Sequence, residues 1–450
     1  MEPNVLLESL IEESGVSRAG LAGHVNRAGR SRGLSLRYEH TAVSRWLKGQ
    51  RPRGQVPDLI CEVLGARLGR PVGLDDIGMG ASAASAGTDT GSGNASLSGF
   101  VERATALWRS DEQRRPHLAA VPAVTGTSAV MPVWEWENPP EDTDVSRPGP
   151  GRVSPADIAM LKAARDHYEQ MYRKTGGVAT RSRIVRFLNA EAAPLLRGGH
   201  SDALGRSLHR ATAGLVAVAG ICAYDSDAHG LAQRYFHQAL RLAKSSGDRG
   251  LGGYVIALLV TQSLFLGDYR RSIAFAEAAL RAAGDHITPA LAADLHAMQA
   301  KAYAQLGDAA SARACIGRAE AQAGRIHTGR EPDETGYVQP GLVDVQVAEA
   351  LIGLGDLPAA REHAASAVRA PAHDRGRVHR LAMLSHIELL QGEADRAAGT
   401  AAEMAVRARG MESQRLRDRL RQVRRELAAS GCADAVGTAD LIDEALRVPL

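Results

Sequence analysis

A degenerate internal repeat in the C-terminal part of the sequence is the feature that most restricts how this chain can fold. Four glycines anchor the repeat, Gly267, Gly307, Gly355 and Gly392, with spacings of 40, 48 and 37 residues. An earlier copy fits the same frame with Asp227 in the glycine position. A small residue follows each glycine after five positions, and another apolar residue follows after twelve. These residues are Ser272, Ala312, Ala360 and Ala397 at the fifth position, and Ala279, Ala319, Ala367 and Met404 at the twelfth.

Each copy predicts a hairpin of two helices. The glycine and the acidic residue after it form the turn, because glycine readily adopts the left-handed backbone that ends a helix. The small residues let the second helix approach its neighbours closely. Such hairpins bury their apolar faces only by stacking, so the pattern predicts an α-solenoid. It resembles the tetratricopeptide repeat family, with five copies over about residues 214–412, although that family's usual period is near 34 residues and its aromatic signature positions are mostly absent here.

Helices are also expected on both sides of the repeats. Residues 155–197 predict two further helices, and the arginine-rich residues 411–430 predict a polar helix that caps the solenoid. The chain has 450 residues, 44% of them hydrophobic but only 4% aromatic, which suits packing of helices better than sheets. This length exceeds what one core usually serves. We therefore expect an all-α protein with a small domain over 1–75, a linker over 76–153 and the repeat domain over 154–450.

Cysteine usage and hydropathy indicate a cytoplasmic protein without a metal site or cofactor. The N-terminus carries acids where a secretory signal needs a basic start, and the longest strongly apolar stretch, residues 254–260, is too short to span a bilayer. We expect no membrane partner. The cysteines lie far apart and form no Cys-x-x-Cys pair, so neither a disulfide framework nor a zinc site is expected. They are Cys61, Cys222, Cys315 and Cys432.

Residues 1–75 predict a compact unit of four helices. The last helix is the clearest, because apolar residues recur at helical spacing over residues 56–68. Gly15 is expected to stop the first helix, and Ser17 to cap the second.

The linker over residues 76–153 combines three features. Residues 78–99 lack the apolar surface needed to order a chain, which predicts a flexible tether. A short helix is expected over residues 100–115. Trp134 and Trp136 follow in a tract rich in proline, glycine and acids. Such tryptophans dock onto the chain's own helical domain more often than they bind a partner, and we favour docking.

Positive charge is concentrated between residues 27 and 53. This segment contains eight basic residues and a single acid, Glu39, which gives a net charge of +7. The whole chain carries only +3. The rest of the chain is on balance acidic, so the positive field is focused on this segment. A basic run by itself is often only a solvated face. The eight residues are Arg27, Arg30, Arg32, Arg37, Arg45, Lys48, Arg51 and Arg53.

Inside this segment lies HTAVSRWLKGQRPRG, from His40 onward. It resembles the recognition helix and exit turn of the lambda-repressor-like, xenobiotic-response-element class of helix-turn-helix proteins. In this resemblance Val43 and Trp46 seat the helix on its domain, and Gly49 ends it. Ala22 takes the small position where the two helices of the motif cross. The resemblance implies that the N-terminal domain binds double-stranded DNA.

The resemblance also implies two groups of DNA contacts. Side chains near the start of the recognition helix enter the major groove, where arginine reads guanine through two parallel hydrogen bonds, so Arg45 is the strongest candidate. For His40 and Ser44, surface exposure or capping is the simpler alternative. The expected base contacts are His40, Thr41, Ser44 and Arg45. The expected phosphate contacts, which set register without reading sequence, are Arg18, Arg37, Tyr38, Lys48, Arg51 and Arg53.

One departure from the class concerns the connection between the two helices of the motif. Residues 26–39, NRAGRSRGLSLRYE, add roughly ten residues to the usual short turn. Arginine mixed with glycine and serine suggests an arm that touches the DNA backbone or a minor groove. The alternative is an unusual geometry of the helix pair.

The wider chain resembles a group of actinobacterial regulators that join such a domain to tetratricopeptide repeats and act in sporulation or antibiotic production. The matching stretches are RYEHTAVSRWLKGQRPRGQVPDLI, VWEWE and AYDSDAHGLAQRYFHQALRLA. We therefore expect a transcription regulator. The solenoid architecture suggests a homodimer paired through the repeats, with a peptide, small-molecule or protein effector on the concave face.

An enzyme and a pure scaffold are the competing interpretations. The sequence contains no phosphate-binding loop, no nucleophile elbow and no His-Glu-x-x-His zinc pair, so we expect no catalytic residues. The alternative that we keep is a non-enzymatic tetratricopeptide scaffold or peptide receptor whose N-terminal domain binds DNA weakly or not at all.

Overall fold

The computed structural model shows a helical chain made of two compact units, residues 1–90 and 91–450. Within the described part, the only β features are isolated bridges that pair Arg147 with His200 and Arg152 with Gly199. The prediction of an all-α fold is therefore confirmed. Most of the expected tether over residues 78–99 lies outside the described residues. The structure describes residues 4–31, 34–52, 56–68, 72–74, 76–79, 97–113, 118, 120–138, 142–149, 151–327, 329–338, 341–431 and 434–447.

The four helices of the first unit follow from local signals in the sequence. Asn4 caps the first helix, since its Oδ1 accepts a hydrogen bond from the Leu7 amide at 3.1 Å, and Gly15 ends that helix with φ +64°. Ser17 Oγ accepts a hydrogen bond from the Gly20 amide at 3.1 Å. The predicted stop at Gly15 and cap at Ser17 are confirmed. The helices are α1 (Val5–Ser14), α2 (Arg18–Ser31), α3 (His40–Leu47) and α4 (Val56–Leu68).

The core of the first unit includes residues beyond the boundary expected at residue 75. Ile77 and Met79 are buried together with apolar side chains from all four helices. The Asn4 amide donates to the Leu47 carbonyl at 2.7 Å, and Asn4 Nδ2 donates to the Ile77 carbonyl at 2.9 Å. Asn4 thus joins the start of α1, the end of α3 and this last segment. The folded unit extends at least to Met79.

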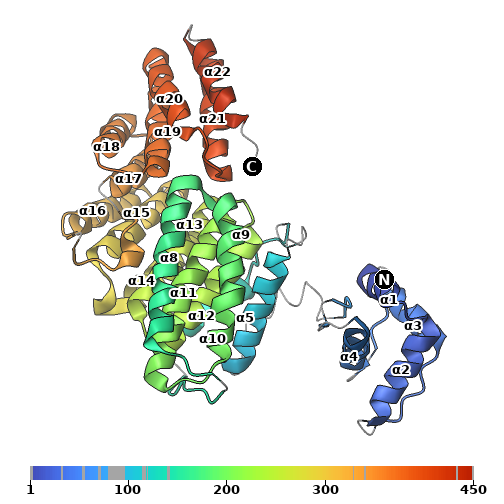
Figure 1. Cartoon of the computed structure of the whole chain (residues 1–450). Helices are drawn as coiled ribbons and strands as arrows, with labels where there is room; N and C mark the ends of the chain where they lie inside the picture. Colours follow the sequence, from blue (N-terminus) through green and yellow to red (C-terminus); the bar gives the residue numbers. More distant parts are fainter. Residues whose placement is uncertain are drawn as a thin grey trace. The chain divides into compact units, whose positions relative to one another are not determined.

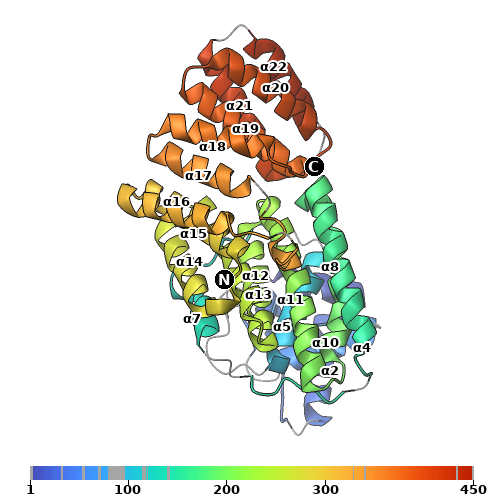
Figure 2. The same cartoon turned by 90° about the vertical axis from the view of Figure 1, so that its left-hand side faces the viewer.

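The second unit is a solenoid-like succession of helical hairpins (Figures 1 and 2). It begins with α5 (Leu97–Glu112), α7 (Thr127–Glu137), α8 (Pro155–Thr175), α9 (Gly177–Phe187) and α10 (Ala193–Arg197). Each hairpin packs on the next through neighbouring helices. The hairpins are α11 (Asp202–Asp225) with α12 (His229–Ser246), α13 (Arg249–Phe265) with α14 (Tyr269–Ala283), α15 (Pro289–Gln305) with α16 (Ala309–Ala323), α17 (Leu342–Gly353) with α18 (Leu357–Arg369), α19 (Asp374–Leu390) with α20 (Ala394–Ala408), and α21 (Gln414–Ser430) with α22 (Ala435–Leu446).

Every anchor of the repeat lies in a left-handed turn between the two helices of a hairpin. The φ angles of Gly267, Gly307, Gly355 and Gly392 are +76°, +78°, +75° and +79°. In each turn the anchor amide donates to the carbonyl three residues back, and the next amide donates to the carbonyl five residues back. Asp227 makes the same two bonds with φ +64°, and among the described residues it is the only non-glycine with a positive φ. The frame read from the sequence therefore matches the turns.

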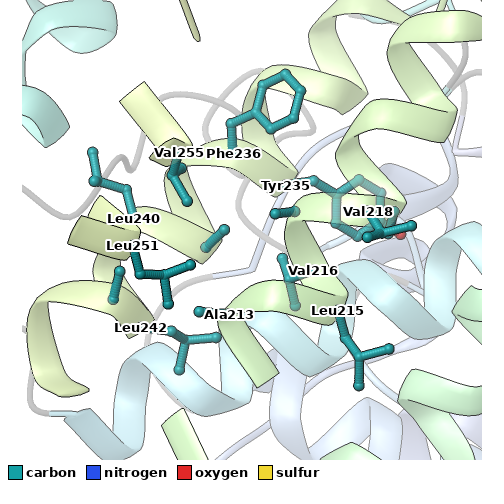
Figure 3. Packing of buried hydrophobic residues seen from close by; sticks show 14 of the residues in the cluster. Ala213, Leu215, Val216, Val218, Tyr235, Phe236, Leu240, Leu242, Leu251 and Val255 are labelled. Carbon is teal, nitrogen blue, oxygen red and sulfur yellow. The ribbon is translucent and has the colours of Figure 1, made fainter. Parts of the chain in front are cut away.

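The positions five and twelve residues after each anchor lie in the core of the second unit. In the five copies all ten side chains, including Ala232 and Ala239 of the first copy, have no exposed surface. Close packing of small residues allows the helices to approach one another. Figure 3 shows how side chains from α11, α12 and α13 meet in the largest apolar cluster, among them Val216, Tyr235 and Val255.

The region expected to be a linker contributes two helices, α5 and α7, to the second unit. Trp108 of α5 is fully buried, and its Nε1 donates to Gln238 Oε1 at 2.9 Å. Trp136 of α7 is also buried, and the Arg249 guanidinium lies 5.3 Å from its ring centroid. Its neighbour Trp134 is 55% exposed. Of the two tryptophans for which we favoured docking, only Trp136 contacts the core.

The start of the second unit lies against its C-terminal hairpins. Asp225, at the end of α11, has no exposed surface. Its Oδ2 accepts a hydrogen bond from the Gly177 amide at 2.8 Å, and its Oδ1 accepts one from Ser413 Oγ at 2.8 Å. Arg375 at the start of α19 also donates to this carboxylate. One buried acid therefore connects α9, α11, α19 and α21.

Two further observations concern the cysteines and the hydropathy of the helices. Cys61, Cys222 and Cys315 are buried thiols, and Cys432 lies outside the described residues. Of the helices that the structure describes, none is both long enough and apolar enough to cross a membrane.

Candidate nucleic-acid interface

Helix α3 of the first unit has one apolar face and one polar face. Its apolar residues recur at three and four positions, which seats the short helix firmly on the core. The side chains between them point away from the core. The buried residues are Ala42, Val43, Trp46 and Leu47. The exposed residues, with the first residue after the helix, are His40, Thr41, Arg45 and Lys48.

The seat of α3 is built around Trp46, which is 3% exposed. The Tyr38 ring meets the Trp46 ring edge-on, with centroids 5.1 Å apart and an interplanar angle of 69°. Val43 and Ala22 are buried in the same core cluster, and α2 packs directly on α3. All three residues assigned to packing from the sequence, Ala22, Val43 and Trp46, thus lie in the core of this unit. The rigid seat fixes the direction of the polar face.

The four side chains proposed for base contacts differ in their exposure and in their hydrogen bonds within the protein. His40, Thr41 and Arg45 are exposed. Ser44 is half-buried, and its hydroxyl donates to the His40 carbonyl at 3.0 Å within the same helix. Ser44 is thus engaged locally as a donor, which leaves its oxygen as an acceptor. Arg45 is the long cationic side chain on this face, so it has the greatest reach.

The residues proposed for phosphate contacts surround this face. Arg37, Lys48 and Arg51 are exposed. Arg18, at the start of α2, forms a loose ion pair with Glu8 at 3.6 Å, in which both side chains are about half exposed. An exposed pair of this kind is weak and leaves the guanidinium available. Tyr38 is half-buried against Trp46, and Arg53 lies outside the described residues.

The connection between α2 and α3 corrects one sequence expectation. Residues 26–31 belong to α2, so the extra length partly extends that helix and is not all inserted between the two helices. Asn26 clamps the returning chain: its Nδ2 donates to the Tyr38 carbonyl and its Oδ1 accepts from the Tyr38 amide, both at 2.8 Å. Leu34 and Leu36 pack against the core. The described part of the connection, residues 34–39, is therefore bound to its own domain and does not form a free arm.

Two features of this unit escaped the sequence analysis. Arg67 of α4 lies beside His24 of α2, with Nη2 and Nε2 2.8 Å apart. Burial, followed by the charges of Arg67 and Arg27, lowers the pKa of His24. The second feature is the Asn26 clamp. Neither pair has a recognisable sequence signal, because the partners are 43 and 12 residues apart.

The arrangement is suited to an anionic surface that carries hydrogen-bonding groups. Over residues 34–52 the four cations Arg37, Arg45, Lys48 and Arg51 are all exposed, and Glu39 is the only acid. Exposed guanidinium and ammonium groups bind phosphate oxygens, and an arginine on a helix face also reads guanine.

One protein family matches this part of the chain. Residues 7–80 match the protein family described as the SP15 N-terminal domain. The match covers α2, α3 and α4, all but the first two residues of α1, and the segment that contains Ile77 and Met79. No curated protein matches the chain significantly.

Proposed function

We propose that this protein is a sequence-specific DNA-binding transcription regulator of the bacterial helix-turn-helix type, acting in development or secondary metabolism. The observation that carries the proposal is the two-faced helix α3. Its apolar face, which includes Trp46, packs in the core of the first unit, and its opposite face presents Arg45 together with exposed cations nearby.

In this proposal α2 and α3 form the helix-turn-helix, with α3 in the major groove. Arg45 donates two hydrogen bonds to the O6 and N7 of a guanine, an interaction worth about 1 to 3 kcal/mol of discrimination between bases. His40 and Thr41 contact neighbouring base edges. Ser44 acts as an acceptor, since its hydroxyl proton is used within the helix.

The surrounding cations hold the DNA backbone. Arg37, Lys48 and Arg51 are exposed and contact phosphates. Arg18 exchanges its weak ion pair with Glu8 for a contact with a phosphate. Arg53 and the Tyr38 hydroxyl complete the proposed set. Such contacts fix the register of α3 in the groove without reading sequence.

The second unit supplies pairing and control in this proposal. Its hairpins carry the frame that resembles tetratricopeptide repeats, and stacked hairpins of this kind present extended surfaces to partners. Two chains paired through these repeats would present two recognition helices to half-sites about 34 Å apart, which is one turn of DNA.

A binding-site selection followed by gel shifts tests the proposal. Arg45→Ala should reduce the preference for the selected site over a site with one changed guanine by about 5- to 150-fold. Arg51→Ala should weaken binding to both sites alike. Arg103→Ala, an exposed arginine of α5 in the second unit, is the matched control and should change neither.

The salt dependence of binding separates a regulator from a scaffold. Neutralisation of six phosphates gives a log-log slope of about −5 against salt concentration, and loss of one contact reduces the slope by about one. If no sequence is enriched, or if Arg45→Ala binds the selected site with unchanged preference, the recognition role of α3 is wrong. The alternative is then the scaffold, whose N-terminal unit binds DNA only weakly and without saturation.

A further inference from the structure

The connection between α16 and α17 is unusually long, and it folds onto other helices of the second unit. The anchors Gly307 and Gly355 are 48 residues apart, compared with 40 and 37 for the neighbouring pairs. We name residues 329–338 of this connection the strap. Because the hairpin frame on both sides is unchanged, the additional residues must be accommodated outside the hairpins.

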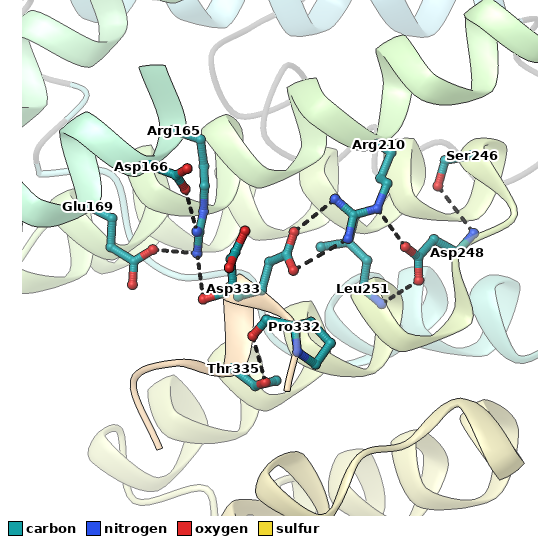
Figure 4. A network of polar contacts seen from close by, with 11 residues as sticks. Arg165, Asp166, Glu169, Arg210, Ser246, Asp248, Leu251, Pro332, Asp333 and Thr335 are labelled. Carbon is teal, nitrogen blue, oxygen red and sulfur yellow. Dashed lines mark hydrogen bonds and ion pairs between the residues drawn. The ribbon is translucent and has the colours of Figure 1, made fainter. Parts of the chain in front are cut away.

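Specific polar contacts hold the strap in place (Figure 4). Glu334 is 7% exposed, and its Oε1 accepts a hydrogen bond from Arg210 Nη1 of α11 at 3.0 Å. Arg165 Nη2 of α8 donates to the Asp333 carbonyl at 3.3 Å. The Tyr337 hydroxyl donates to the buried carboxylate of Asp294 in α15. Three helices far apart in the sequence thus fix the position of the strap.

A cavity of about 690 Å³ lies between the strap, α8, the end of α16 and the start of α17. A volume of this size is typical of sites for small ligands. Carboxylates dominate the charged groups of its lining, which contains six of them and only two guanidinium groups. The carboxylates are those of Asp166, Glu169, Glu320, Glu331, Asp333 and Asp344, and the guanidinium groups are those of Arg165 and Arg173.

The two arginines of the lining are already neutralised. Arg165 is 7% exposed and pairs with Asp166 at 2.8 Å and with Glu169. Arg173 pairs with the other oxygen of Glu169. These pairs leave a formal excess of four negative charges on the lining, so the field inside the cavity favours a cation.

Two carboxylates of the lining have few partners within the protein and can pair with a cationic ligand. The Asp333 side chain accepts no hydrogen bond or ion pair from any residue that the structure describes, although its backbone is fixed by Arg165. Glu320 has only a distant contact, 3.5 Å, with His363, and half of its side chain is exposed. Asp344, in contrast, already accepts hydrogen bonds from His363 and Ser366.

Apolar groups line the same cavity. Ala323 is the last residue of α16, and Ile326 follows that helix. Val338 ends the strap, and Val343 lies in the first turn of α17. A lining that combines carboxylates with aliphatic side chains complements a cation on an aliphatic stem, because the stem gains from leaving water while the charged end stays paired.

We propose that this cavity binds a guanidinium or ammonium group carried on an aliphatic stem, as in an arginine side chain of a short peptide or in a polyamine. Asp333 and Glu320 pair with the cation, and Ile326 and Val343 contact the stem. The binding site is independent of DNA binding. Its role as the effector site of a regulator rests on the proposed function.

Titration calorimetry of the full-length chain tests the site. One probe is acetyl-Leu-Arg-Leu-amide, and its control contains citrulline, which has the shape of arginine without the charge. The second probe is spermidine, which distinguishes a polyamine source from a peptide source. The arginine peptide or spermidine should bind saturably at one site per chain, and the citrulline peptide should bind at least about tenfold more weakly.

Charge-neutralising variants locate the binding site. The double variant Asp333→Asn with Glu320→Gln should lower the affinity of the bound probe by at least about tenfold. Glu403→Gln, on the exposed surface of α20, removes a carboxylate elsewhere and should leave the affinity unchanged. Thermal unfolding of each variant establishes that the fold is retained.

Three results would overturn the inference: no saturable heat with either probe at millimolar concentration, equal binding of the citrulline peptide, or full affinity in the double variant. The effector role is tested separately, by the change in operator affinity when the bound probe is added. If the chain does not recognise DNA, the calorimetric result still decides whether the cavity is a cation site.

Discussion

Replacement of an anchor glycine by alanine should destabilise the second unit through the backbone alone. An added Cβ would meet no atom within 4 Å at Gly267, Gly307, Gly355 or Gly392, so no clash contributes. The left-handed backbone costs an L-residue about 1 to 2 kcal/mol. Alanine also restricts the unfolded chain, which offsets about 0.4 to 1 kcal/mol of this loss. We expect a net destabilisation of about 1 kcal/mol at each anchor.

Gly317 in α16 and Gly399 in α20 provide matched controls for the anchors. Both have open space around the position of a Cβ, but both lie inside helices and neither has a positive φ. Alanine should stabilise these positions by about 0.5 to 1 kcal/mol, because it restricts the unfolded chain and favours the helix. The same chemical change should therefore have opposite signs at Gly267 and Gly317.

Urea unfolding of the full-length chain, followed by far-UV circular dichroism, measures these effects. The midpoint should decrease for Gly267→Ala and increase for Gly317→Ala, with the slope of the transition unchanged. If both variants shift the midpoint in the same direction and by the same amount, the left-handed turn is not what requires glycine at the anchors. The interpretation of the repeat frame would then have to be abandoned.

Three further predictions follow from single contacts. Gly252→Ala should destabilise the second unit by about 2 kcal/mol or more, because the new Cβ would lie 2.0 Å from Trp136 Nε1. Gly253→Ala should not destabilise it, because the nearest atom would lie at an ordinary contact distance of 3.4 Å. Thermal unfolding of the two variants distinguishes these outcomes. Asn26→Ala removes two hydrogen bonds at 2.8 Å that hold the connection before α3, so melting of the first unit should show a loss of about 1 to 3 kcal/mol. Burial, followed by the nearby charge of His200, lowers the pKa of His209 from 6.5 to about 4. As the pH decreases, the imidazole is therefore protonated in the unfolded chain before it is protonated in the folded chain, so stability falls as the pH decreases below 6.5. Between pH 7.5 and pH 5 this residue should account for a loss of about 2 kcal/mol, and urea unfolding at both values should show a smaller loss in His209→Gln.

Part of the candidate interface could be read from the sequence because helix faces follow a local period. The resemblance assigned Val43 and Trp46 to the core side of α3, and helix geometry then required Arg45 to lie on the other side. The Asn26 clamp could not be found in this way. It depends on the path of residues 34–38, and the sequence between α2 and α3 was compatible with a free arm.

The sequence by itself determined the hairpins of the second unit. A left-handed turn requires glycine or a tolerant residue such as Asp227, and a close helix contact requires a small residue. Both requirements act over a few neighbouring positions, so they leave a visible repeat. Even the turn at Asp227, which lacks glycine, was recognisable from its place in the frame.

Only the tertiary structure decided how distant segments meet. Asp225 binds groups from residues 177 and 413, and the strap is held by Arg165 and Arg210 from two other helices. The contact of Asp225 with Ser413 and those of the strap with Arg165 and Arg210 join residues 124 to 188 positions apart, and no local pattern records such pairings. The cavity beside the strap exists for the same reason, because its walls come from segments that approach one another only after the solenoid has formed.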